Sequence, residues 1–220
     1  MTSDGSGALE RILSRIRAQQ GKTATASADE RAAVHSHIHS RPQHPRPRAD
    51  WEPLARFRER ALGLSSTVDE VDSLAAAPAA IARYLKSNSL PLTAVCWAEF
   101  AALDWRAVGL EVAARAARDS DLVGITGAYC AIAETGTLMT VTGPGTPATV
   151  SLLPETHIAI VSAARIVRGM EEAWQLMRDE LKQPPRAVSF ISGPSRTADI
   201  EQTVTLGAHG PYRVHIVVTG

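Results

Sequence analysis

Four short apolar runs decide how this chain folds: GTLMTV at 136–141, HIAIVSA at 157–163, AVSFIS at 187–192 and RVHIVV at 213–218. Each run is continuous and rich in β-branched residues, which is typical of strands buried on both faces of a parallel sheet. A helical apolar stripe over 168–181 separates the second run from the third, and a shorter helix is expected around 198–205. Strands that alternate with helices predict an α/β fold, with a mainly parallel sheet flanked by helices.

Towards the N-terminus the same alternation continues. A helix is expected from Trp51 to Leu62, and Thr67 to Glu70 has the spacing of a capping box that opens another helix. Pro78 suits the first turn of a further helix that ends near Ser87. Three more segments complete the expected domain of residues 51–220: a strand in PLTAVCWA (91–98), a short helix in EFAALDW (99–105) and an edge strand in LEVAARA (110–116).

Residues 1–50 differ in composition, because they hold four of the seven histidines and no Phe, Trp or Tyr. Ser6 can cap a short helix whose apolar residues fall at i, i+3, i+4 and i+7. After Gly21 the small, polar and Pro-rich composition predicts an extended or mobile segment. The histidines there (His35, His37, His39 and His44) have no preorganised geometry for a metal, so we expect a solvated linker and no metal site.

Composition and charge exclude several classes of protein. The 220 residues carry a formal net charge of zero, whereas binding nucleic acid needs a basic excess. No apolar run approaches the roughly 20 residues that span a bilayer, and the N-terminus lacks the apolar core of a secretory signal, so we expect a cytoplasmic protein. Cys96 and Cys130 cannot supply the four thiolates usual for an iron–sulfur cluster, so no cofactor is expected in this chain.

The stretch AIAETGTLMTVTGPG, residues 131–145, places one carboxylate between an apolar run and glycine-bearing turns. Glu134 is followed by Thr135, Gly136 and Thr137, small residues that let a backbone approach a ligand closely. A carboxylate near apolar walls suits a general base or a nucleophile. Equally, Glu134 could accept hydrogen bonds from neighbouring amides and only tie the turn, so both interpretations stay open.

Two further loops could bind an anion. In TGPGTPAT (142–149), Gly143, Gly145 and Thr146 can aim N–H groups at an anion, although a simple strand connection is the more frequent outcome. In ISGPSRTADIEQ (191–202), Gly193 makes a turn and Ser195 or Thr197 caps a helix, beside Arg196. Free amides at a helix start next to an arginine favour an anion site, and the alternative is a well-capped structural helix.

Three histidines follow or lie within the predicted strands. His209 lies between the glycines of LGAHGPYRVHI (206–216), where it could act as an acid–base group or simply be a turn residue bonded to backbone. His215 lies inside a strand and is expected to pack there, and His157 opens another strand. None of them has a metal-ligand spacing.

Several of these stretches occur together, in order and at specific intervals: AIAETGTLMTVTGP, SLLPETHIAIV, RIVRGMEEAW and ISGPSRTADIEQTVTLGAHGPYRVHI. In this combination the chain resembles the LUD domain family and, within it, the lactate utilization protein C (LutC/YkgG) group. The resemblance is dense from Asp119 to Val218 and looser back to Trp51. It implies a fold similar to the NagB/RpiA/CoA-transferase-like α/β fold.

The resemblance also implies a role in oxidising L-lactate to pyruvate, together with LutA-like and LutB-like partner proteins that carry the iron–sulfur clusters. This chain would be the short accessory component without a cluster. CoA transferases have a catalytic Glu followed closely by Gly, which Glu134-Thr135-Gly136 resembles. The chain could therefore instead be an enzyme, or an anion-binding sensor, acting on a small carboxylate, thioester or phosphorylated metabolite, with residues 143–146 and 195–197 holding the anionic group.

Overall fold

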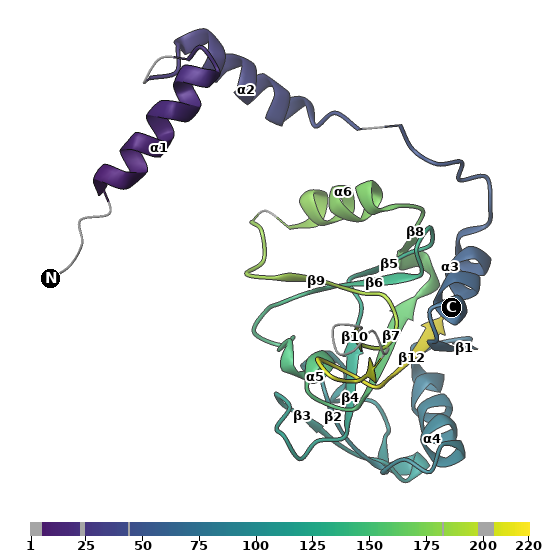
Figure 1. Cartoon of the computed structure of the whole chain (residues 1–220). Coiled ribbons are helices and arrows are strands. Elements are labelled where there is room, and N and C mark those ends of the chain that lie inside the picture. The colour runs from purple at the N-terminus through teal and green to yellow at the C-terminus, as the bar shows by residue number, and fades with distance from the viewer. Residues whose placement is uncertain (1–5, 23–24, 44, 182, 198–204) are drawn as a thin grey trace, which may run out of the picture. The chain divides into compact units, whose positions relative to one another are not determined.

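The computed structural model describes residues 6–22, 25–43, 45–181, 183–197 and 205–220. The chain forms two compact units, Met1–Pro47 and Arg48–Gly220. The first unit contains helices α1 (Ser6–Gln19) and α2 (Ala28–Ser40). The second unit contains two β-sheets with helices packed against them (Figure 1).

Helix α1 is the helix predicted near the N-terminus, but α2 differs from the extended segment expected after Gly21. A capping box begins α2: the hydroxyl of Ser27 accepts a hydrogen bond from the Glu30 amide at 3.1 Å, and the Glu30 carboxylate accepts one from the Ser27 amide at 2.9 Å. These two bonds satisfy amides that the first turn would otherwise leave unpaired. His35, His37 and His39 lie on α2, whereas His44 lies outside the described residues.

A six-stranded sheet forms the centre of the second unit, in the order β1-β12-β7-β4-β2-β3. Every neighbouring pair in it is parallel, which confirms the predicted α/β fold with a mainly parallel sheet flanked by helices. The strands are β1 (Thr67–Val71), β2 (Thr93–Cys96), β3 (Glu111–Ala114), β4 (Val123–Gly127), β7 (Thr156–Ser162) and β12 (Arg213–Thr219).

The helix predicted from the capping-box spacing at Thr67 is wrong, because this segment is strand β1. Thr67 pairs with His215 and Val71 with Thr219, so the whole segment extends the sheet beyond β12. The β-branched residues Thr67 and Val68 suit a strand, and pairing with β12 outweighs the local helical signal.

Helices cover both faces of the central sheet. On one face, α4 (Ala77–Ser87) contributes Ile81 and Leu85 to a core with Ile125 and Ile158. On the other face, α3 (Pro53–Gly63) contributes Phe57 and packs with the second sheet. Both helices were predicted. The short elements of the unit are the four-residue α5 (Thr149–Leu152) and the 3₁₀ helices η1 (Leu74–Ala76), η2 (Ala98–Phe100), η3 (Arg106–Val108) and η4 (Ala163–Arg165).

The second sheet has the order β8-β5-β6-β9, with β5 (Cys130–Ile132), β6 (Thr137–Val141), β8 (Ile166–Val167) and β9 (Val188–Ile191). Strand β6 is antiparallel to both β5 and β9, so the prediction that 136–141 and 187–192 are parallel strands is wrong. Leu138 packs towards the central sheet, and Met139 packs with Met177 of α6 (Met170–Glu180). Burial on both faces makes the sequence of β6 continuously apolar whatever the strand direction, whereas β9 is only partly buried and Phe190 is exposed.

A two-stranded hairpin, β10 (Arg196–Thr197) with β11 (Thr205–Leu206), precedes β12. The helix expected around 198–205 falls on residues outside the described part, except that Thr205 lies in β11. Within the described ranges, no helix has both the length and the apolar character needed to cross a bilayer.

Candidate functional site

Glu134 lies in the tight turn that joins β5 to β6. The backbone of this residue is fixed on both sides, since its amide donates to the Arg168 carbonyl at 2.9 Å and its carbonyl accepts from Arg60 Nε at 3.2 Å. The side chain is half-buried, and its carboxylate accepts no hydrogen bond from any residue that the structure describes. The turn is therefore held without the carboxylate, which stays available to a ligand or partner.

Two glycines of the sequence motifs pack directly on the end of α3. Gly136 has φ of +69°, and a Cβ there would lie 2.6 Å from the amide nitrogen of Ala61. Gly193 has φ of +84°, and its Cβ would lie 2.4 Å from the carbonyl oxygen of Leu64. Positive φ and close approach to backbone both require glycine. These contacts bring the Glu134 turn and the loop after β9 to the same segment, at the end of α3.

A chain of hydroxyl groups joins these two motifs. Thr135 Oγ1 lies 2.7 Å from Thr137 Oγ1, which lies 2.7 Å from Ser192 Oγ. Thr137 is buried, whereas Thr135 is exposed beside Glu134. The hydroxyls therefore run from the surface at the Glu134 turn to the end of β9, and each of them can donate or accept.

Arg196 and Thr197 lie in β10, and no helix begins at Ser195 as expected. Arg196 Nη2 donates to the Leu64 carbonyl at 2.8 Å and to Ser65 Oγ at 2.6 Å. The Ser195 amide donates to the Pro211 carbonyl at 2.9 Å. This loop follows an antiparallel strand and contacts the residues that lead into β1 and β12, so it lies at the amino ends of the parallel strands and not at their carboxyl ends.

A polar groove of about 340 Å³ adjoins the β10–β11 hairpin. Its walls are Glu155, Leu206, Gly207, Gly210, Tyr212 and Arg213. The Arg213 guanidinium lies 4.8 Å from the centre of the Tyr212 ring, and it forms no ion pair within the described residues. His209 is exposed in the neighbouring turn and does not line the groove.

The loop with Gly143, Gly145 and Thr146 lies at the other end of β6 from Glu134, a separation of roughly 16 Å for a five-residue strand. It packs on the end of β2: the Ala98 amide donates to the Gly145 carbonyl at 3.2 Å. Trp97 Nε1 donates to the Pro147 carbonyl at 3.1 Å, and Thr146 Oγ1 donates to the Val141 carbonyl at 3.0 Å. The structure therefore does not bring this loop to Glu134.

A second carboxylate, Glu99, lies where β2 and β4 end and was missed from the sequence. A Cβ on Gly127 would lie 2.5 Å from Glu99 Oε1, so the carboxylate packs directly against the backbone of this glycine. Partial burial of the carboxyl group raises the pKa of Glu99, although much of the residue is exposed to solvent. In the central sheet, β2 is followed by β3 on one side, whereas β4 is bordered by β7 on the other side. The strand order therefore reverses between β2 and β4, and ligands often bind at such a switch point of a parallel sheet. The strand that ends at Gly127 was not predicted, which hid this signal.

The two thiols lie in separate apolar cores, Cys96 beside α4 and Cys130 beneath α6. Burial raises the pKa of each thiol to about 11, so both are protonated at neutral pH. The described residues contain no group of three or more His, Cys, Asp or Glu side chains placed to hold a metal ion.

His157 and His215 are packing residues within the central sheet. His157 Nε2 lies 2.7 Å from Thr126 Oγ1, and His215 Nδ1 lies 2.9 Å from Thr67 Oγ1. The His215 ring stacks on Tyr84 with 3.8 Å between ring centres. Burial lowers the pKa of both histidines to about 4, so each is neutral at pH 7 and neither is exposed to act on a ligand.

Comparison with known proteins places the motifs in a family. The family model of the LUD domain matches residues 98–219, a range that includes Glu134, Ser192 and Arg196. A protein named "Lactate utilization protein C" from Exiguobacterium sp. is 38% identical over 62% of this chain and 61% of its own length. One with the same name from Geobacillus sp. is 41% identical over 44% of this chain and 42% of its own length. The match thus spans less than two thirds of these relatives.

A solved structure shares the fold. The crystal structure of a DUF162 family protein from Deinococcus radiodurans is 25% identical and superposes with a TM-score of 0.60, covering 80% of this chain and all of that one.

Proposed function

Because the chain belongs to the LUD domain family, within its lactate utilization protein C group, we propose that it serves lactate utilization as a component that supports the oxidation of L-lactate to pyruvate. The observation that carries this proposal is its similarity to relatives named for that process. The matched range contains the Glu134 turn and the loop after β9, the two motifs that meet at the end of α3.

Oxidation of lactate releases two electrons, which in this proposal pass to LutA-like and LutB-like partner proteins that hold iron–sulfur clusters. The burial and the protonation of the two thiols support the proposal that the partners, and not this chain, carry the clusters. Cys96 and Cys130 are buried apart from each other and protonated at neutral pH, whereas a cluster needs several thiolates at one place. In this account the chain acts as an accessory component of the system.

A second candidate function is favoured by the geometry of Glu134. The Glu134 carboxylate has no partner among the described residues, and Thr135, Thr137 and Ser192 form a chain of hydroxyls beside it. This arrangement suits a base or nucleophile acting on a small carboxylate, thioester or phosphorylated metabolite. The expected likeness to CoA transferases points to the same residue and stays a prediction. A sensor of small anions is the third candidate, and the guanidinium of Arg213 in the groove suits it better than Arg196, which is bound to Leu64 and Ser65.

Lactate-dependent dye reduction by the two purified iron–sulfur partners tests the proposal. The reaction is run with the wild-type chain, with Glu134→Gln and without the chain. An accessory role predicts that both versions restore the rate equally, whereas an enzyme that uses the carboxylate predicts that only the wild type does. If the rate is the same without the chain, the lactate proposal fails.

A further inference from the structure

The N-terminal unit exposes an unusual amount of apolar side chain. Leu9, Ile12 and Ile16 of α1 are 59%, 57% and 47% exposed, and Val34 and Ile38 of α2 are 58% and 61% exposed. No described residue of either helix is buried. Helices of 14 and 13 residues gain most of their stability from packing an apolar face, so this surface is suited to be covered.

The apolar residues of α1 follow the spacing by which a helix enters a groove. Leu9, Ile12, Leu13 and Ile16 fall at i, i+3, i+4 and i+7, the pattern of anchor residues in helix-in-groove recognition. Leu13 is partly covered, while the other three lie open to solvent. The exposed stripe defined by Leu9, Ile12 and Ile16 is therefore available to a partner.

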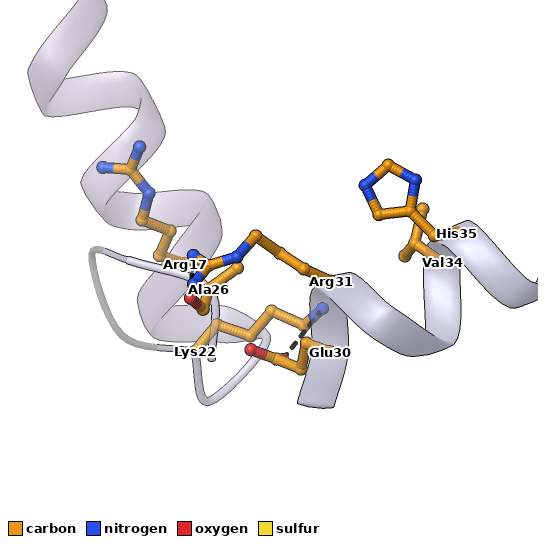
Figure 2. Close-up of a pocket in the computed structure, with 7 residues that line it drawn as sticks. All are labelled: Arg17, Lys22, Ala26, Glu30, Arg31, Val34 and His35. Atoms are coloured by element: carbon orange, nitrogen blue, oxygen red, sulfur yellow. Dashed lines mark hydrogen bonds and ion pairs between the residues drawn. The ribbon is translucent and has the colours of Figure 1, made fainter. Parts of the chain in front are cut away.

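A basic pocket of about 360 Å³ lies between the two helices, lined by Arg17, Lys22, Ala26, Glu30, Arg31, Val34 and His35 (Figure 2). Three of these residues are cationic and one is acidic. Two of the three cations are paired, Lys22 with Glu30 at 3.6 Å and Arg17 with Glu10 at 3.3 Å. Arg31 donates to the Ala26 carbonyl at 2.7 Å and forms no ion pair with a described residue, so its guanidinium is the cation left to meet a carboxylate. The pocket is suited to receive a carboxylate.

The exposed stripe and the basic pocket together indicate what kind of molecule would bind this unit. Residues 6–40 carry five Lys or Arg and three Asp or Glu, a basic excess that favours an acidic partner. Residues 1–50 contain no Phe, Trp or Tyr, although aromatic side chains commonly anchor a helix in a membrane interface. A free small anion would fill the pocket and leave the stripe exposed. A protein surface covers both.

We propose that α1 and α2 form a docking unit for an acidic protein partner, in which the exposed stripe enters an apolar groove and the basic pocket receives a carboxylate side chain from the groove's rim. This inference rests on the proposed function, since it takes the partner to be one of the two iron–sulfur proteins.

Binding of the full-length chain to each purified iron–sulfur partner tests this inference. The stripe variant is Ile12→Asp with Ile16→Asp, and the pocket variant is Arg17→Glu with Arg31→Glu. Matched controls are Leu74→Asp, a change of an exposed apolar residue in the other unit, and Arg106→Glu, a change of an exposed arginine there. Because no described residue of α1 or α2 is buried, thermal unfolding of the second unit should be unchanged in both double variants. The two controls change exposed side chains of the second unit, so its unfolding should shift little in them as well.

We expect each double variant to raise the dissociation constant for one partner at least about tenfold, and we expect both controls to bind like the wild type. Added salt should weaken the wild-type complex and have little further effect on the pocket variant. Wild-type affinity in both double variants overturns the inference, as does a wild-type chain that binds neither partner. Binding to phosphatidylglycerol vesicles that the stripe variant abolishes, without binding to either protein, would show a membrane site instead.

The proposed function is tested apart from this inference by omitting the chain from the lactate-dependent dye reduction. If the chain is required but the double variants restore the rate and bind normally, only the docking inference fails. If the chain is not required, the proposed function fails whatever the binding result.

Discussion

Gly136 and Gly193 place the two motifs against α3, and this role can be tested residue by residue. Changing either to Ala adds a Cβ that meets backbone atoms at 2.6 and 2.4 Å, at φ values that L-residues rarely adopt. We expect each change to lower the free energy of unfolding by about 1–3 kcal/mol. Urea unfolding measures this loss.

Gly145→Ala is the matched control for these two changes. A Cβ at Gly145 would meet only the Cβ of Ala98 at 3.5 Å, an ordinary contact, so little loss is expected. Equal losses at Gly136, Gly193 and Gly145 would contradict the close packing of the first two on α3.

The hydroxyl chain gives a second prediction at this scale. Thr137→Val removes the central hydroxyl but keeps the shape of the side chain, so Ser192 loses its partner and a buried polar contact is lost. We expect a loss of about 1–2 kcal/mol in urea unfolding. Thr135→Val, at an exposed position, should cost less. If Thr137→Val leaves the free energy of unfolding unchanged, the row of hydroxyl groups does not contribute to stability.

At the residue scale, the sequence led to Glu134 through its unusual surroundings, because a carboxylate between apolar residues and glycines needs a reason. It could not show that Arg196 turns to Leu64 and Ser65, since those partners lie far away along the chain. Glu99 was not predicted as a site residue for a similar reason. Its significance comes from Gly127, which belongs to another strand.

Secondary structure elements were predictable where their own apolar pattern determines their packing. The stripes of α3, α4 and α6 each face one core, and all three helices were predicted. A continuous apolar run carries no information on strand direction, so β6 and β9 were predicted to be parallel, and β9 proved to be only partly buried. β4 was not predicted because it contains two glycines, which are rare in strands. One of them, Gly124, is needed because a Cβ there would lie 2.0 Å from the Val150 carbonyl oxygen.

Helix α2 depends on its capping box, which gives a prediction at the scale of one element. Ser27→Ala removes the hydroxyl that accepts from the Glu30 amide, at a cost of about 1 kcal/mol to the helix. Hydrogen exchange of the amides in α2 should become roughly fivefold faster. Ser40→Ala is the control, because the Ser40 hydroxyl donates to a carbonyl in the last turn. Unchanged exchange in Ser27→Ala would contradict the cap.

At the scale of the whole molecule, two buried histidines make stability depend on pH. Burial lowers the pKa of His157 and of His215 to about 4 in the folded chain, against about 6.5 when unfolded. Below pH 6.5 the unfolded chain binds protons that the folded chain cannot. The free energy of unfolding should therefore fall between about pH 6.5 and 4, by up to roughly 1.4 kcal/mol per pH unit for each histidine.

Urea unfolding at pH 7.5, 6 and 5 measures this slope. His157→Gln keeps a partner for Thr126 but removes one titrating group, so its slope should be flatter than that of the wild type even if its stability at pH 7.5 is lower. His209→Gln, a change at an exposed position, should leave the slope unaltered. A wild-type slope in His157→Gln would show that this histidine does not contribute.

The proposed place of the chain in lactate oxidation is tested most directly by titration. Increasing amounts of the full-length chain are added to fixed amounts of the two iron–sulfur partners with L-lactate and dye. We predict that the rate of dye reduction rises as the chain is added and saturates at a fixed molar ratio of the chain to the partners. A rate that is already maximal without the chain, or that never changes as the chain is added, would contradict it.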